Sequence, residues 1–436
     1  MAFEDLPTEL RILILKSLPD VHALRNLVCA SPSYYDTYLL AKRDLLLDLA
    51  KRLYGLVDLA EPVAAIRSEG LYANVASNKE KIIALLDRRR RHGELSQSRK
   101  DTCAGAPSNI HESIQLLHLY KKLDALLQAY QSHAPCPPWV DQETWKQQLP
   151  LQLSETERAR ILRALCRIQT YYNIVGAREY AETEAEAQSE PGSPCSRKSS
   201  TWYKNFTTNE IWNLFFGTMP PWEVEEFGSV WVFIRDQYRD MFAEVAREFP
   251  RSDARWKALR PRSLPVEMVS LYPNPEEDDI VDDVHGYNEY CNHLVSLGPC
   301  FLQKVRSQPR YQDRRNMLAC NAIASKSSFM DLVEVIRDPP PLLYPADKYD
   351  SPDIGRLLPT LPAMEQPNPS WKQHWHHDGT LESVVFATRP RVSVDGIQPW
   401  TAQNDLERTI GYFDGWDWGY SLLDTERVGN GAHLMA

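Results

Sequence analysis

The chain contains 436 residues, of which 43% are hydrophobic and 25% are charged, a composition typical of a globular protein with about two to three domains. Its 49 basic and 59 acidic side chains leave a net charge of −10, so electrostatics provides no general attraction to nucleic acid or to an anionic membrane. With only 18 glycines, the composition also disfavours folds that bind phosphate through glycine-rich loops. A protein is therefore the expected partner.

The sequence contains no run of about 18 apolar residues, and residues 1–5 lack the basic region and apolar stretch of a signal peptide. We therefore expect a protein without a membrane span, in the cytoplasm, the nucleus or both. Its eight cysteines include no CxxC pair, and we expect them to be reduced thiols.

Sequence motifs of catalysis are absent, because the chain has no GxSxG elbow, phosphate loop, GxGxxG or HExxH. The densest set of potential metal ligands is His374, His376, His377 and Asp378. It superficially resembles the HxHxDH motif of metallo-β-lactamases, but the aspartate comes one position early and Gly379 follows it. We therefore expect no metal, no cofactor and no enzymatic activity.

Three short helices are predicted in the first 55 residues. Pro7 suits the first turn of the first helix, and Pro19 ends that helix. Asp20 can cap the second helix, which is interrupted at Ser31-Pro32. Ser31 can then cap a third helix that runs on towards Tyr54.

Further helices are predicted beyond this unit. Apolar residues recur at helical spacing near residues 82–86 and over 111–131, and Ser154 to Glu157 form a capping box ahead of another helix. A long helix is expected from Trp222 to Val245, with an apolar inner face. Its predicted inner-face residues are Phe227, Val230, Trp231, Ile234, Tyr238, Phe242 and Val245.

Other segments are unsuited to long helices. A polar linker is expected from about His92 to Asn109, and a flexible loop over 182–201, which is too poor in apolar residues to offset the cost of ordering. Residues 338–369 contain nine prolines and are expected to form an extended segment that wraps over the helical body. The aromatic tail after Thr388 could contain short strands.

The first predicted helix is apolar on more than one side, because Leu10, Ile14 and Leu18 form one stripe while other apolar residues lie elsewhere. A unit of about 45 residues is too small to cover one helix on every side. Either the rest of the chain or another protein must cover the remainder.

The segment Leu6-Pro7-Thr8-Glu9-Leu10, followed by Leu18-Pro19 and Val28-Cys29, resembles an F-box. Where that family commonly places a tryptophan, this chain has Tyr34 and Tyr35, either of which could fill the aromatic role. The looser combination of Ser154, Tyr171-Tyr172-Asn173 and Pro220-Pro221-Trp222 with this segment resembles the F-box-like proteins of filamentous fungi.

This resemblance implies a mainly α fold, with an F-box-like adaptor-binding module over residues 1–55 and a helical substrate-recognition body over 56–436. It implies a substrate receptor that binds a Skp-type adaptor and, through it, a cullin ubiquitin ligase. The alternative is a non-catalytic interaction or regulatory protein whose F-box-like segment is part of its own core. The expected adaptor-binding residues are Leu6, Pro7, Leu10, Ile14, Leu15, Leu18, Pro19, Val21, Leu24, Leu27 and Val28.

An unknown target protein is expected to bind the body beyond residue 60, because a module this small cannot supply two interfaces of about 800 Å² each. Tryptophans are enriched among the residues that dominate protein interfaces. The candidate target-binding residues are Trp222, Trp375, Trp416 and Trp418.

Overall fold

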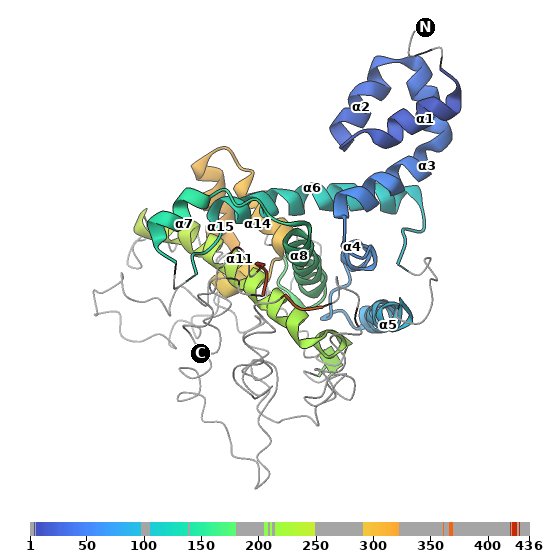
Figure 1. Cartoon of the computed structure of the whole chain (residues 1–436). Coiled ribbons are helices and arrows are strands. Elements are labelled where there is room, and N and C mark those ends of the chain that lie inside the picture. Colours follow the sequence, from blue (N-terminus) through green and yellow to red (C-terminus); the bar gives the residue numbers. More distant parts are fainter. Residues whose placement is uncertain are drawn as a thin grey trace, which may run out of the picture.

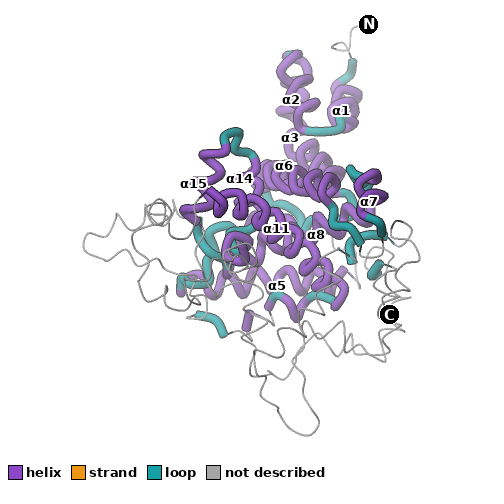
Figure 2. The backbone as a smooth tube through the Cα atoms, turned by 90° about the vertical axis from the view of Figure 1, so that its left-hand side faces the viewer, coloured by secondary structure: helices purple, strands orange, loops and turns teal. Residues whose placement is uncertain are grey.

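The computed structural model describes residue 4, residues 6–96, 105–137, 140–179 and 291–321, most of 205–248, and short pieces between residues 361 and 427. The described residues form helices and connecting loops and contain no strand (Figures 1 and 2). The mainly helical fold predicted from the sequence is thus confirmed for this part of the chain.

The first three helices begin and end close to the predicted positions: α1 spans Thr8–Ser17, α2 spans Val21–Ala30 and α3 spans Pro32–Tyr54. The Asp20 side chain accepts a hydrogen bond from the Ala23 backbone N–H at 2.7 Å, as expected of a cap. Ser31 occupies the capping position of α3, but its side chain makes no capping hydrogen bond. Instead, Pro32 starts the helix, because its fixed φ angle and missing N–H suit a first turn.

The remaining helices form the body of the molecule. The bounds are α4 Ala60–Arg67, α5 Lys79–Ser96, α6 Ile110–His133, α7 Gln142–Gln148, α8 Glu155–Val175, α11 Pro221–Glu248, α14 Pro299–Arg306 and α15 Tyr311–Asn321. Two short 3-10 turns, Ala76–Asn78 and Phe216–Thr218, precede α5 and α11. Helix α8 lies at the centre of the body, where it packs against α4, α6, α11 and α14 (Figure 1).

Helices α8 and α11 have the local features that their sequences predict. The capping box at the start of α8 is present, since Ser154 and Glu157 bond to each other's backbone N–H groups. Every residue predicted for the inner face of α11 is buried. The predicted polar linker after His92 begins later than expected, because α5 continues to Ser96 through Glu94 and Leu95, which favour a helix.

Several predicted features lie outside the described residues. These are the flexible loop 182–201, most of the proline-rich segment 338–369, and any strands in the tail after Thr388. Within the described part, no helix is both long enough and apolar enough to cross a membrane.

Candidate protein-binding surface

Helices α1 to α3, which we call the N-terminal module, project from the body (Figures 1 and 2). Helices α1 and α2 both pack against α3, and α3 in turn packs against α6 of the body. The module has a hydrophobic core of its own, which one residue of α6 joins. The members of this core are Leu15, Leu24, Val28, Tyr34, Leu45, Leu46, Leu49, Ala50 and Leu117.

Three of the expected adaptor-binding residues belong to this core and are not on the surface. Leu15, Leu24 and Val28 are buried among the module's own helices. Leu24 and Val28 are four positions apart, so they share one face of α2. That face packs against α3. The expectation that these three leucine and valine side chains contact a partner is therefore corrected: they stabilise the module that would present such a surface.

Four other expected residues lie at the edge of this core. Ile14, Leu18 and Leu27 are partly buried and pack against it, and Leu6 is half-buried ahead of α1. Each of these side chains lies partly in the module's interior and partly on its surface. A substitution at any of them would therefore affect both the stability of the module and the binding of a partner.

The remaining four expected residues, Pro7, Leu10, Pro19 and Val21, are exposed. Leu10 retains 45% of its surface in contact with solvent, and Val21 retains 42%. These two side chains therefore gain only part of the stabilisation that full burial would bring. They form the part of the expected surface that is available to a partner.

The module also exposes large apolar residues that sequence reasoning missed. Leu13 on α1 and Tyr35, Leu39 and Leu40 on α3 are all exposed, with Leu40 the most exposed at 78%. One signal was present in the sequence: adjacent residues on a helix point about 100° apart, so Leu39 and Leu40 cannot both face a narrow interior. Of the two candidate aromatic residues, Tyr34 fills the core while Tyr35 faces solvent.

Polar contacts hold α1 on α3 along its length. The Arg11 guanidinium donates to the Ser33 carbonyl oxygen at 2.8 Å, and Lys16 pairs with Asp48 at 2.8 Å. The hydrogen bond from Lys16 to Asp48 raises the pKa of Lys16. These contacts fix the outer face of α1, with Leu10 and Leu13, relative to α3.

The C-terminal end of α3 is anchored in the body. The buried Tyr54 hydroxyl donates to the Leu116 carbonyl oxygen of α6 at 3.1 Å, and its ring meets that of Tyr120 edge-on. Arg158 of α8 donates to the Leu53 carbonyl oxygen at 3.0 Å. Because α3 is one continuous helix with its N-terminal half in the module and its C-terminal end in the body, it sets the orientation of the exposed surface.

The residues expected to bind a target lie elsewhere. Trp222 is only 1% exposed, because it lies in the first turn of α11, which packs against α8 in the main core. Its predicted role as a surface anchor is therefore corrected to a packing role. Trp375, Trp416 and Trp418 lie outside the described residues.

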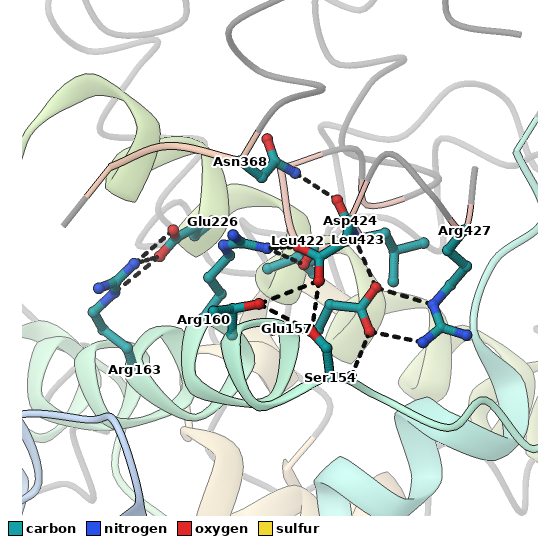
Figure 3. A network of polar contacts seen from close by, with 11 residues as sticks. Ser154, Glu157, Arg160, Arg163, Glu226, Asn368, Leu422, Leu423, Asp424 and Arg427 are labelled. Atoms are coloured by element: carbon teal, nitrogen blue, oxygen red, sulfur yellow. Dashed lines mark hydrogen bonds and ion pairs between the residues drawn. The ribbon is translucent and has the colours of Figure 1, made fainter. Parts of the chain in front are cut away.

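A short piece near the C-terminus packs against the start of α8 (Figure 3). Leu422 and Leu423 are fully buried. Asp424 pairs with Arg160 at 2.7 Å, and Arg427 pairs with Glu157 at 2.9 Å. These described residues near the C-terminus are therefore structural.

Helix α8 carries a ladder of buried charges that extends beyond this piece. Arg163 pairs with Glu226 of α11 at 2.6 Å, and Arg167 pairs with both Glu61 of α4 and Glu223 of α11 at 2.7 Å. Although burial alone opposes the charged form of Arg167, the two carboxylates raise its pKa. Each of these charges has an opposite partner, so the ion pairs join α8 to α4 and α11.

Potential metal ligands do not gather at one place in the described part of the chain. These residues contain no group of three or more histidine, cysteine, aspartate or glutamate side chains placed to hold a metal. His374, His376 and His377 lie outside them. Cys29, Cys136, Cys166, Cys291 and Cys300 are free thiols, as the sequence predicts.

No known protein family matches this chain, and neither a curated protein nor a solved structure shows significant similarity to it.

Proposed function

We propose that this protein is a substrate-receptor subunit of a Skp-cullin-F-box type ubiquitin ligase, with the N-terminal module as its adaptor-binding part. The observation that carries the proposal is the exposed apolar surface of the module, chiefly Leu10 and Leu13 on α1 and Leu39 and Leu40 on α3. Because the same segment resembles an F-box, we infer that the partner is a Skp-type adaptor.

Burial of this surface favours association with a partner. Covering each half-exposed leucine would contribute about 1 kcal/mol, before the cost of association is subtracted. The large apolar side chains that are exposed in the described part of the chain all lie on this projecting module, and a concentration of this kind is typical of an interaction site. The module's polar contacts hold these residues in place before binding, which lowers the ordering cost.

The mechanism would be one of proximity. The module would hold the adaptor while the body holds a target protein, and transfer of ubiquitin to that target would become effectively intramolecular. The anchoring of α3 through Tyr54 favours this mechanism, because a fixed geometry between adaptor and target concentrates the target near the ligase. The chain itself would supply no catalytic group.

One observation favours the alternative of a non-catalytic interaction or regulatory protein that binds no adaptor. Leu117 of α6 is part of the module's core, and Ile110 and Ile114 pack against it, so the module is continuous with the body on that side. This contact covers a face of α3, however, and leaves Leu10 and Leu13 exposed. The receptor function therefore has the stronger support.

Co-purification with a Skp-type adaptor tests the proposal. We expect Leu10→Asp with Leu13→Asp to lower adaptor recovery at least tenfold, because placing a carboxylate in an apolar interface costs several kcal/mol. Because Leu10 is 45% and Leu13 59% exposed, the substitutions should change the stability of the free protein less than they change adaptor recovery, and a thermal melt measures that change. Ile14→Asp is a poorer choice, since Ile14 also packs against the module's core.

A control variant carries the same added charge on the exposed polar positions Gln142 and Gln147 of α7. Gln142→Asp with Gln147→Asp should bind the adaptor as the wild type does. If the wild-type protein recovers no adaptor, or if Leu10→Asp with Leu13→Asp leaves recovery intact, the receptor function is wrong and the alternative is favoured.

A further inference from the structure

The connection between α14 and α15 concentrates positive charge on an otherwise acidic protein. Residues 304–315 contain five basic side chains and one acidic side chain, in a chain of net charge −10. The basic residues are Lys304, Arg306, Arg310, Arg314 and Arg315. Lys304, Arg306 and Arg310 are exposed and the other two are half-buried. Of these side chains, Lys304 already pairs with Glu179.

Three of these arginines have no carboxylate partner within the part of the chain that the structure describes. Arg306 donates to the neutral side-chain oxygen of Gln237, and Arg314 donates to the Gln308 carbonyl oxygen at 3.1 Å. Arg310 forms no ion pair with a described residue. We refer to Arg306, Arg310 and Arg314 as the arginine cluster.

The arginine cluster differs from the buried arginines of this protein. Arg160, Arg163 and Arg167 on α8 each pair with a carboxylate. At Arg306, by contrast, partial burial lowers the pKa of the guanidinium, and no carboxylate among the described residues offsets the effect. A guanidinium that is partly removed from water without an anionic partner retains both its charge and its unused hydrogen-bond donors.

The surroundings of the cluster suit a peptide. Half-buried Tyr311 lies beside Arg314, whose guanidinium carbon is 6.0 Å from the ring centre, so an aromatic surface adjoins the charges. The α14–α15 connection lies at the upper edge of the body, on the side from which the N-terminal module projects (Figures 1 and 2).

We propose that the arginine cluster binds an acidic segment of a partner protein. Arginine presents a planar set of donors that matches carboxylate or phosphate oxygens with two parallel hydrogen bonds. A nucleic acid is the less suitable occupant, because it needs a longer basic track than one interhelical connection supplies. This binding does not depend on whether the N-terminal module binds an adaptor.

Fluorescence anisotropy with the purified full-length chain tests the proposal without any adaptor. The probes are a short labelled glutamate-rich peptide, the same peptide with glutamines in place of the glutamates, a phosphoserine version, and single-stranded DNA of equal length. The test variant is Arg310→Gln with Arg314→Gln. The control variant, Lys51→Gln with Lys81→Gln, removes the same charge from exposed positions outside the cluster.

We expect the glutamate-rich peptide to bind the wild type, and the glutamine peptide not to bind. The test variant should bind the glutamate-rich peptide about tenfold more weakly, because it lacks two of the charged donors, while the control variant should bind as the wild type does. Affinity should fall as salt is added. Tighter binding of the phosphoserine peptide that is abolished in the same variant would also support the proposal and identify phosphate as the stronger ligand.

Three results would overturn the proposal. They are an absence of binding by both anionic peptides, equal weakening in the test and control variants, and tighter binding of DNA than of either peptide through the same arginines. Thermal melts of both variants accompany the binding curves. Because both replaced side chains lie at the surface or half-buried, the melts should match that of the wild type and any loss of affinity then reports the contact itself.

Discussion

The N-terminal module and the centre of the body place their side chains in opposite ways. On α1 and α3, leucines such as Leu13 and Leu40 face solvent, whereas on α8 the arginines Arg163 and Arg167 face the interior. Folded proteins usually show the reverse. The buried charges have partners within the chain, which makes them structural, whereas these leucines keep more than half of their surface exposed within the described part of the chain, which leaves them available to a partner.

The difference also separates two kinds of energy. In a buried ion pair, the attraction between the charges is offset by a large desolvation cost, so the pair adds little net stability. Removing only one of its two partners is strongly destabilising, because the other charge is then buried without a partner. An exposed leucine contributes little until a partner covers it. Substitutions in the ladder of α8 should therefore change stability, and substitutions on the outer face of the module should change binding.

The largest effect on stability is expected at the centre of the ladder. Arg167→Met would leave Glu61 and Glu223 buried without their shared cation, which costs about 3 to 5 kcal/mol. Denaturant unfolding measures this as a shift of the midpoint at constant slope. As a control, Lys146→Met removes an exposed pair with Glu143 and should change stability by less than about 1 kcal/mol. A loss this small for Arg167→Met would show that the pairs are not formed in solution.

A smaller effect is expected within the module, where two leucines can be compared directly. Leu24→Ala removes a buried side chain and should destabilise the protein by about 2 to 5 kcal/mol, if the module unfolds with the body. Leu40→Ala removes an exposed side chain and should change stability by about 0.5 kcal/mol or less.

The same denaturant curves test this pair of substitutions. A separate early transition in Leu24→Ala would show that residues 1–55 unfold independently, as the predicted domain boundary implies. Equal losses for Leu24→Ala and Leu40→Ala would contradict the division between a core face and a binding face.

The smallest effect is expected from the pH dependence of Asp424. Burial opposes its ionisation, but hydrogen bonds from Ser154 and Arg160 hold the pKa of Asp424 below its usual value. A carboxyl group with a lowered pKa in the folded state stabilises the protein above its unfolded pKa of about 3.9, and this stabilisation is lost as the pH falls through the folded value.

Asp424→Asn should therefore lower stability at pH 7 by about 1 kcal/mol. The difference from the wild type should shrink as the pH falls below about 4. Thermal melts across that range measure both quantities. A difference that stays constant with pH would mean that the Asp424 charge does not contribute to the contact between the C-terminal piece and α8.

Local sequence signals predicted α1, α2, α3, α5, α6, α8 and α11, because each signal acts over a few neighbouring residues, whereas the shorter helices α4, α7, α14 and α15 were not predicted. Pro19 ends α1 wherever α1 packs, and Asp20 and Ser154 cap their helices through backbone groups three positions away. The apolar spacing of α11 likewise predicted which of its residues are buried, since a long helix in a core needs one continuous inner face.

The tertiary structure decided which apolar and charged residues are available to a partner. Leu10 and Leu15 look equally apolar in the sequence, yet α3 covers only Leu15. Arg167 and Arg310 are likewise equivalent until α4 and α11 bring carboxylates to one of them. The covering residues lie far away along the chain, so no pattern within a few residues contains this information. Availability for binding is set by long-range packing, whereas helix formation is set largely by near neighbours.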